Sequence, residues 1–292
     1  DYRLSFSVGQ NTTGVRRSFT LELFSADGVV KLGSISITQV AGGEESPDNL
    51  IFKVRANYAN GFTVQLPLDG NVDCTIDWGD GSDPEEITYG APKHSYSSVV
   101  SDYIVKISGK VTSLSSSGIS HPAITEVIQW GYTGLTRMDN AFVNNALLEK
   151  IPGDANGAFS EVTSFSSAFR NCIKLKSLPE DLLTFCTKIT SLSNTFSNCT
   201  SLEGVPEKLL HNATELTRVD GLFEGCTAFS VIPDKLFAAN NKLVSFNTVF
   251  RCTAIKTIPR GLLKNCPKIK SFSRSFSYCT SLIYVPDDLF SY

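Results

Sequence analysis

Three aspartates lie within one short segment of the sequence, at Asp77, Asp80 and Asp83. Clustered carboxylates are the ligands that Ca²⁺, a hard cation, prefers, so this segment is a candidate calcium site. However, no glutamate closes a loop of EF-hand length, and the run Gly79-Asp80-Gly81 is typical of a tight hairpin turn. We therefore expect the aspartates to hold turn amides and assign no metal, with calcium as the alternative.

The three histidines lie in different sequence contexts, at His94, His121 and His211. A catalytic site needs a nucleophile, a base or a metal brought together. The sequence contains no G-x-S-x-G, H-E-x-x-H or Gly-rich phosphate loop. The acidic pair Glu180-Asp181 follows a repeated proline and is better explained as the start of a helical turn. We therefore expect no enzymatic activity and no cofactor.

The eight cysteines raise a second question of chemistry. Seven of them recur at two repeated positions: Cys172, Cys199, Cys226, Cys252 and Cys279 at the first, Cys186 and Cys266 at the second. Metal binding is disfavoured because C-x-x-C pairs are missing. Disulfides between neighbouring repeats are sterically feasible, since one repeat step approaches the usual Cα separation. We expect reduced, buried thiols instead, because Ala213, Asn240 and Phe159 replace cysteine at the second position.

These residues are positioned by a repeat that fills the second half of the chain. Its phenylalanines are spaced 27, 27, 27, 27 and 26 residues apart, and its prolines 27, 27, 27, 26 and 27. They are Phe142, Phe169, Phe196, Phe223, Phe250 and Phe276, with Pro152, Pro179, Pro206, Pro233, Pro259 and Pro286. We place the single deletion between Phe250 and Cys252, where F-x-x-C shortens to F-x-C.

This register predicts a solenoid over residues 141–292, in which each coil buries its inward side chains on its neighbours. Two short strands per coil are expected, around residues 175–178 and 189–192 in one of them. Helical turns that open at residues such as Pro179 would join these strands. The predicted fold class is therefore mainly β with short helical turns.

The first half of the chain alternates apolar and polar residues, which predicts β-strands. In the first segment, residues 1–41, we expect antiparallel strands around 4–8, 19–23 and 35–40. The segments that follow are a polar linker over 42–49, a second β module over 50–115, and a junction with the N-terminal cap of the repeats over 116–140. Within the second module, strands are expected over 62–66, 74–78 and 103–107.

Net charge and hydropathy exclude some classes of partner. The formal net charge is −3, which argues against a nucleic-acid binder. No apolar run approaches the ~18 residues that a bilayer span needs, so no transmembrane segment is expected. The chain begins at Asp1 without Met or an apolar signal segment, as a trimmed or mature fragment would.

Two N-terminal segments resemble known β modules. The turn T-I-D-W-G-D-G-S, followed by H-S-Y and Y-I-V-K-I, resembles a PKD-like domain and implies an immunoglobulin-like sandwich. In that family's H-x-Y position, His94 is expected to tie a loop to the sheet. N-T-T-G-V-R-R-S-F-T-L-E-L with G-S-I-S-I-T-Q-V-A-G-G is similar to the second half of a BACON domain, an immunoglobulin-like module of Bacteroidetes surface proteins. That family is associated with glycan or mucin contact, but no binding residue carries over, and a spacer role is expected.

The repeat itself resembles that of BspA-like leucine-rich repeat surface proteins of Bacteroidetes, whose units carry F-x-x-C-x-x-L. The resemblance covers residues 124–292 and includes the junction V-I-Q-W-G, which such proteins place before their first repeat. The first repeat departs from the pattern with Asn145 in the cysteine position, as a capping coil would. The resemblance implies an exported protein at the cell surface, anchored at the outer membrane, with a lipid anchor upstream as one means of attachment.

Exposed, variable positions beside the repeat form the candidate ligand face. They are Lys188, Glu215, Lys242 and Lys268 in one stripe, Lys176, Lys256 and Tyr284 in a second, and Arg251, Arg274 and Tyr278 near the last coils. Stacked repeats offer an extended surface suited to proteins or long glycans. The expected partner is an unidentified extracellular protein or glycan, and the expected function is adhesion or recognition without covalent chemistry. The alternatives are a glycan-capture component of a polysaccharide uptake system and a non-binding structural stalk.

Overall fold

The computed structural model describes residues 17–24, 31–39 and 46–289. The chain divides into two compact units, Asp1–Pro47 and Asp48–Tyr292. The second unit carries the aspartate turn, all the cysteines and the whole candidate ligand face.

The first unit contains one pair of antiparallel strands. Strand β1 (Arg17–Phe24) pairs with β2 (Lys31–Gln39), and Phe19 lies opposite Ile37 in the register. Two of the three predicted strands are thereby confirmed. The strand expected over residues 4–8 lies outside the described residues.

The second unit begins with a five-stranded antiparallel sheet in the order β6-β5-β8-β3-β9. Its strands are β3 (Leu50–Ala56), β5 (Asn71–Asp77), β6 (Glu85–Tyr89), β8 (Ser101–Lys110) and β9 (Ile124–Gln129). The other elements are β4 (Thr63–Gln65) and β7 (Lys93–Ser95), which pair antiparallel, and the 3-10 helix η1 (Tyr58–Asn60). Strands β4, β5 and β8 confirm the strands predicted in this module.

Alternating burial explains why β5 forms a strand. Val72, Cys74 and Ile76 are buried, while the residues between them are exposed or half-buried, because successive side chains of a strand point to opposite faces. Trp78 follows and is also buried, and its Nε1 donates to Glu85 Oε2 at 3.0 Å. The strand therefore supplies one wall of the core.

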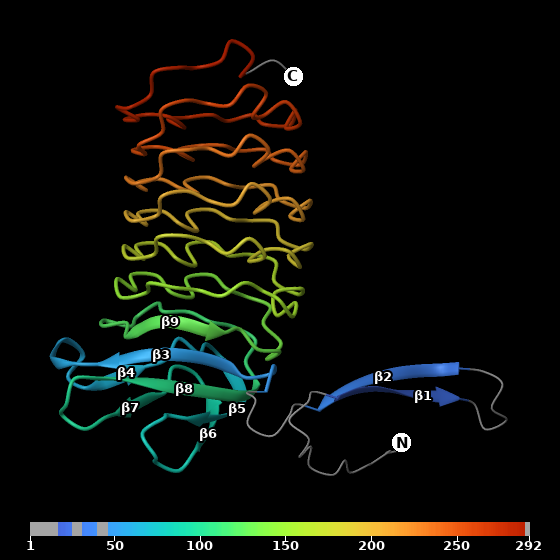
Figure 1. Ribbon diagram of the computed structural model, residues 1–292, viewed down its shortest axis with the longest axis vertical. Helices are drawn as coiled ribbons and strands as arrows, with labels where there is room; N and C mark the ends of the chain where they lie inside the picture. The colour runs from blue at the N-terminus through green and yellow to red at the C-terminus, as the bar shows by residue number, and fades with distance from the viewer. Residues whose placement is uncertain (1–16, 25–30, 40–45, 290–292) are drawn as a thin grey trace. The chain divides into compact units, whose positions relative to one another are not determined.

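Strand β9 joins the sheet to the first repeat. It pairs with β3 on one side, and on the other the Val127 N–H donates to the Lys150 carbonyl at 3.0 Å. The chain then turns at Gly131, whose φ is 66° and whose missing Cβ would lie 2.4 Å from the carbonyl carbon of Asn49. Figure 1 shows the repeats rising from β9, so the sheet and the repeats share one core.

The predicted fold class is wrong. We expected immunoglobulin-like and PKD-like modules followed by a leucine-rich-repeat solenoid of short strands and helical turns. The described residues are mainly β in antiparallel sheets, and among them the sole helix is η1. The segment predicted as a strand over 175–178 forms neither strand nor bridge, and the one over 189–192 has only isolated bridges at Ser191. The segment after Pro179 makes only turns. The expected solenoid of strands and helical turns is therefore not formed.

Strands and helical turns do not form because of two backbone positions in each repeat. These positions lie two residues before and two residues after the phenylalanine. Asn194 and Asn198, which flank Phe196, have φ values of 56° and 59°, and the equivalent residues of every repeat share this left-handed conformation. A left-handed residue interrupts both a helix and a strand. The N–H groups of Asn194, Phe196 and Asn198 donate to the next repeat, while those between them donate three residues back. Each repeat is therefore a series of turns.

These turns lie one above another, and we call residues 138–289 the repeat stack (Figure 1). Adjacent rings of the repeated phenylalanines have centroids 5.4, 5.5, 6.0, 5.6 and 5.8 Å apart and are close to parallel. The rings are those of Phe142, Phe169, Phe196, Phe223, Phe250 and Phe276. The expectation that equivalent phenylalanines pack on one another is confirmed, although the backbone that carries them differs from the prediction.

Candidate functional site

The cysteine thiols of the repeat stack are hydrogen-bond donors in its core. The Sγ atoms of Cys172, Cys199 and Cys226 lie 3.2, 3.1 and 3.0 Å from the carbonyl oxygen of the phenylalanine of the preceding repeat. Burial raises the pKa of Cys226 to about 12, so its thiol stays protonated at neutral pH. All eight cysteines are free, as predicted.

Cys252 does not share this position, contrary to the prediction. It has a φ of 59° and occupies the left-handed position that Gly225 holds in the preceding repeat. Thr253 takes the cysteine position instead: it is buried, and its N–H donates to the Phe250 carbonyl at 3.3 Å, as each cysteine of the column does to its own phenylalanine. The deletion therefore follows Thr253, and Cys252 is partly exposed.

The aspartates of the predicted turn hold backbone amides. Asp77 Oδ1 accepts the Gly79 N–H at 2.9 Å, and Asp80 Oδ1 accepts the Ser82 N–H at 3.0 Å. The bonds from Ser82 and then from His94 hold the pKa of Asp80 at about 2, well below its usual range. The turn interpretation is confirmed for Asp77 and Asp80.

His94 connects this turn to the sheet through β7. Its Nε2 lies 2.8 Å from Asp80 Oδ2, and its ring stacks on Trp78 with centroids 4.8 Å apart. Tyr96, two residues later, donates its hydroxyl to the Trp78 carbonyl at 2.9 Å. The predicted role of His94, tying a loop to the sheet, is confirmed.

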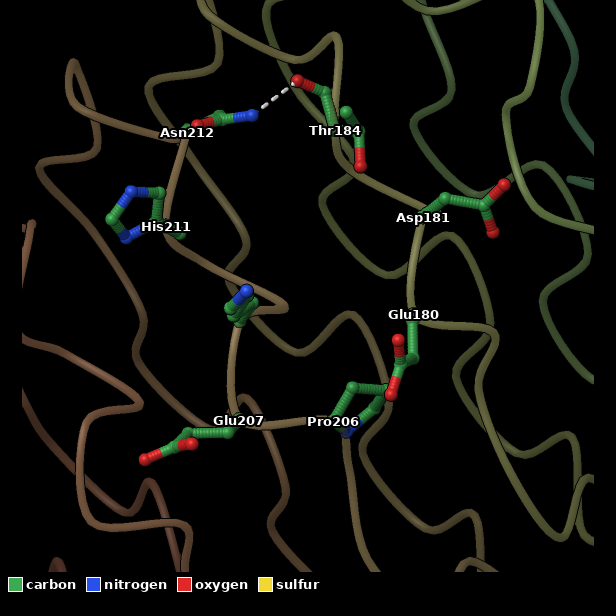
Figure 2. Close-up of a pocket in the computed structure, with 8 residues that line it drawn as sticks. Glu180, Asp181, Thr184, Pro206, Glu207, His211 and Asn212 are labelled. Atoms are coloured by element: carbon green, nitrogen blue, oxygen red, sulfur yellow. Dashed lines mark hydrogen bonds between the residues drawn. The ribbon is translucent and has the colours of Figure 1, made fainter.

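A surface pocket of about 410 Å³ lies between the proline corners of two consecutive repeats. Figure 2 shows its walls, with Glu180, Asp181 and Thr184 on one corner and Pro206, Glu207, His211 and Asn212 on the next. Asn212 Nδ2 donates to the Thr184 carbonyl at 2.7 Å and holds the two corners together. The pair Glu180-Asp181 was predicted to start a helical turn, but it starts a turn only and lines this polar pocket.

In the first predicted stripe, two of the three lysines pair with a glutamate of the preceding repeat. Lys188 Nζ lies 2.6 Å from Glu161 Oε1, and Lys242 Nζ lies 2.5 Å from Glu215 Oε1. Each pair links one repeat to the next, and exposed pairs of this kind add little stability. Lys268 forms no ion pair with any residue that the structure describes.

Lys176 lies in a hollow of about 460 Å³, which we call the lysine hollow. Its lining residues are Glu149, Lys150, Lys174, Lys176, Ser177 and Ser201. Lys174 Nζ lies 2.9 Å from Glu149 Oε1 and lowers the pKa of that carboxyl. Lys150 and Lys176 have no ion-pair partner among the described residues, so the hollow is basic.

Arg251, Arg274, Ser277 and Tyr278 line a third hollow, of about 430 Å³, which we call the arginine hollow. The guanidinium carbon of Arg251 lies 5.2 Å from the centroid of the Tyr278 ring, a cation–π contact. Its Nη1 lies 2.6 Å from Glu224 Oε1. Arg274 is exposed and forms no ion pair within the described part of the chain.

The structure groups some predicted residues and separates others. Arg251, Arg274 and Tyr278 come together, whereas Tyr284 lies on another stripe, where it bridges Thr257. We call this the proline stripe. In each repeat it consists of the two residues that come just before the apolar residue and the proline that follows it. Its members are residues 149–150, 176–177, 203–204, 230–231, 256–257 and 283–284.

Sequence reasoning missed Lys150, Lys174 and Ser277. Lys150 occupies the register position of Ser177 on the proline stripe, so aligning the first repeat with the second could have found it. Lys174 and Ser277 lie in turns that only the structure defines.

The described residues hold neither a metal-binding cluster nor a membrane-spanning helix. Within residues 17–24, 31–39 and 46–289, no cluster of histidine, cysteine, aspartate and glutamate side chains has the geometry to hold a metal ion. Across the same ranges, no helix is long and apolar enough to pass through a lipid bilayer.

Comparison with known proteins finds similarity among solved structures. No protein-family model matches the chain, and no curated protein matches it. Among solved structures it is similar to a leucine-rich cell surface protein from Faecalibacterium prausnitzii A2-165, with 22% sequence identity and a TM-score of 0.35. The match covers 68% of this chain and 44% of that one, so the chain spans less than half the length of this neighbour. A likeness this low assigns neither fold nor function.

Proposed function

We propose that the chain is a surface recognition protein that binds an extracellular protein or glycan without covalent chemistry, through the exposed positions of its repeat stack. One observation carries the proposal. The repeats hold nearly the same side chains at buried positions and different ones at exposed positions, and the exposed ones line the three hollows. A core repeated for packing and a surface varied for contact is the usual division in repeat proteins.

The proline stripe changes character along the stack, which suits an extended ligand. Near β9 it carries Lys150 and Lys176 in the basic lysine hollow. Farther along it exposes apolar side chains, with Val231 at 68% and Ile283 at 84% of full exposure. Exposed apolar residues near polar hollows are typical of contact surfaces.

The proposed setting is the cell surface, with attachment at the outer membrane, in keeping with the resemblance of the sequence motifs to BspA-like proteins. Binding rather than catalysis is part of the proposal. Turnover of a bound glycan by the purified chain would contradict it.

The test immobilises a panel of mucin, polysaccharides and matrix proteins and measures how much of the full chain each member captures. The expected result is binding to at least one of them, weakened by Lys150→Glu with Lys176→Glu. The matched control, Lys110→Glu with Lys93→Glu, changes the same charge on the β-sheets and should bind as the parent does. Failure to bind any member of the panel, or equal weakening by both double variants, would overturn the proposal.

A further inference from the structure

Two left-handed backbone positions near the end of the repeat stack hold residues poorly suited to them. Arg274 has a φ of 58° and Tyr278 a φ of 61°. At the position of Arg274 the other repeats hold Asn140, Ser167, Asn194, Gly221 and Thr248. At the position of Tyr278 they hold Asn144, Asn171, Asn198, Gly225 and Cys252. A bulky residue in this conformation is an outlier, and strain of this kind concentrates at functional sites.

Both of these residues line the arginine hollow. Tyr278 is 70% exposed, and Arg251 lies against its ring. The Arg251 charge is shared with Glu224, while Arg274 has no ion-pair partner among the described residues. The hollow is therefore lined by both an unpaired guanidinium, that of Arg274, and the exposed Tyr278.

The same location two repeats earlier has neither group. There the equivalent residues are Ser197, Gly221, Glu224 and Gly225. Stacking the repeats does not require an arginine or an aromatic ring at this place, so packing does not explain the pair.

We propose that the arginine hollow binds a carboxylate-bearing sugar unit of a glycan. A guanidinium fork pairs with a carboxylate through two parallel hydrogen bonds, which Arg274 is free to make. The exposed ring of Tyr278 packs against the apolar C–H face of a sugar ring, and the Ser277 hydroxyl donates to or accepts from a sugar hydroxyl. This inference rests on the proposed function and names the ligand class of one of its sites.

An acidic peptide fits the hollow less well than a sugar acid. The hollow is lined by four residues of two adjacent repeats, which is enough for one sugar unit. The carboxylates of an acidic peptide are carried on flexible chains, which offer no rigid C–H face to pack on the Tyr278 ring. A single carboxylate next to an apolar ring face matches the arrangement of Arg274 and Tyr278.

The experiment titrates the full chain with a galacturonate trisaccharide, its methyl ester and a tetraglutamate peptide, with binding measured by calorimetry. The variants are Arg274→Asn and Tyr278→Asn, because asparagine holds the equivalent positions in other repeats and folding should persist. The matched control is Arg260→Asn, which removes an exposed arginine outside the hollow. We expect the trisaccharide to bind the parent and the control equally, and each hollow variant and the methyl ester to lose about tenfold or more in affinity.

Three results would overturn the inference: no binding of the trisaccharide, equal binding of its methyl ester, or equal or tighter binding of the peptide. Each leaves the proposed function standing if the parent chain is still captured by the panel of mucin, polysaccharides and matrix proteins. Loss of capture by the whole panel would instead remove the proposed function, whatever the trisaccharide does.

Discussion

The Sγ atom of Cys199 lies 3.1 Å from the carbonyl oxygen of Phe169, one repeat before it. Both groups are buried, and the same carbonyl also accepts the Cys172 N–H at 3.1 Å, so the thiol is its second donor. The same relationship recurs at Cys172 and Cys226. The repeated cysteine thus does more than fill space.

Replacing Cys199 by alanine should therefore lower the free energy of unfolding by about 1–3 kcal/mol, because the Phe169 carbonyl loses its second donor and the missing sulfur leaves a cavity in the core. Cys199→Thr is the matched control, since Thr253 occupies the equivalent position in another repeat, where it is buried and its hydroxyl donates to the carbonyl of its own repeat's Phe250 at 2.8 Å. It should cost less than alanine. Urea denaturation followed by circular dichroism measures both, and an alanine variant as stable as the parent would show that the thiol contact contributes nothing.

Cys252 should react with a thiol reagent before the other seven cysteines. It is the one cysteine of the eight that is not buried, because it lies two residues after Phe250, in the left-handed position that Gly225 holds in the preceding repeat. Labelling of the native chain followed by peptide mapping should give one early site, and the remaining seven should label only on unfolding. Slow labelling at Cys252, or early labelling at Cys199, would contradict the register.

Arg274→Asn should stabilise the chain by roughly 1 kcal/mol, because asparagine tolerates the left-handed conformation better than arginine does. Arg260→Asn, outside the left-handed positions, should leave stability unchanged. The denaturation midpoints of the two variants and the parent measure these changes in stability. A destabilised Arg274→Asn would mean that the side chain contributes packing that outweighs the backbone strain.

Asp80→Asn should lower stability at neutral pH by at most about 1 kcal/mol, since the site is near the surface. The pKa of Asp80 is about 2 in the folded chain, below the value of about 3.9 in unfolded chains. Its contribution is therefore complete above pH 4 and is lost as the pH falls through about 2. Thermal unfolding from pH 7 to pH 2.5 should show the difference in stability between parent and variant becoming smaller. A difference that stays constant would contradict the lowered pKa of Asp80.

Gly131→Ala should destabilise the chain by about 2 kcal/mol or more. The residue has a φ of 66°, and an added Cβ would lie 2.4 Å from the backbone carbonyl carbon of Asn49. Gly134→Ala is the control, because its φ of 87° carries similar strain but nothing lies within 4 Å of its Cβ. Equal losses in the two variants would show that the contact with Asn49 does not matter.

Much of the buried pattern could be predicted from the sequence, but the backbone could not. Repetition alone identifies which side chains pack on their equivalents, and it gave the column that includes Phe169 and Phe196. It does not distinguish strands and helical turns from left-handed turns, because both bury the same positions. Asn194 and Asn198 were the available signal, since asparagine is enriched at positive φ.

The candidate site, too, could be predicted only in part from the sequence. The sequence suggested a patch near the last repeats, and Arg251 and Tyr278 are in contact there. The stripe of Lys188, Glu215, Lys242 and Lys268 was predicted as part of the ligand face, and in the structure Lys242 and Glu215 pair with each other across adjacent repeats. The repeat register gives which positions are neighbours, but whether two side chains pair is seen only once the turns are placed.

The directed hydrogen bonds between repeats have an evolutionary consequence. Because N–H groups such as those of Asn194 and Phe196 all donate to the following unit, each unit presents the same acceptors to its predecessor. A duplicated copy inserted by recombination would meet compatible partners above and below. Gene rearrangement could thus lengthen or shorten the array by whole units and remodel the outer surface without redesigning the interior.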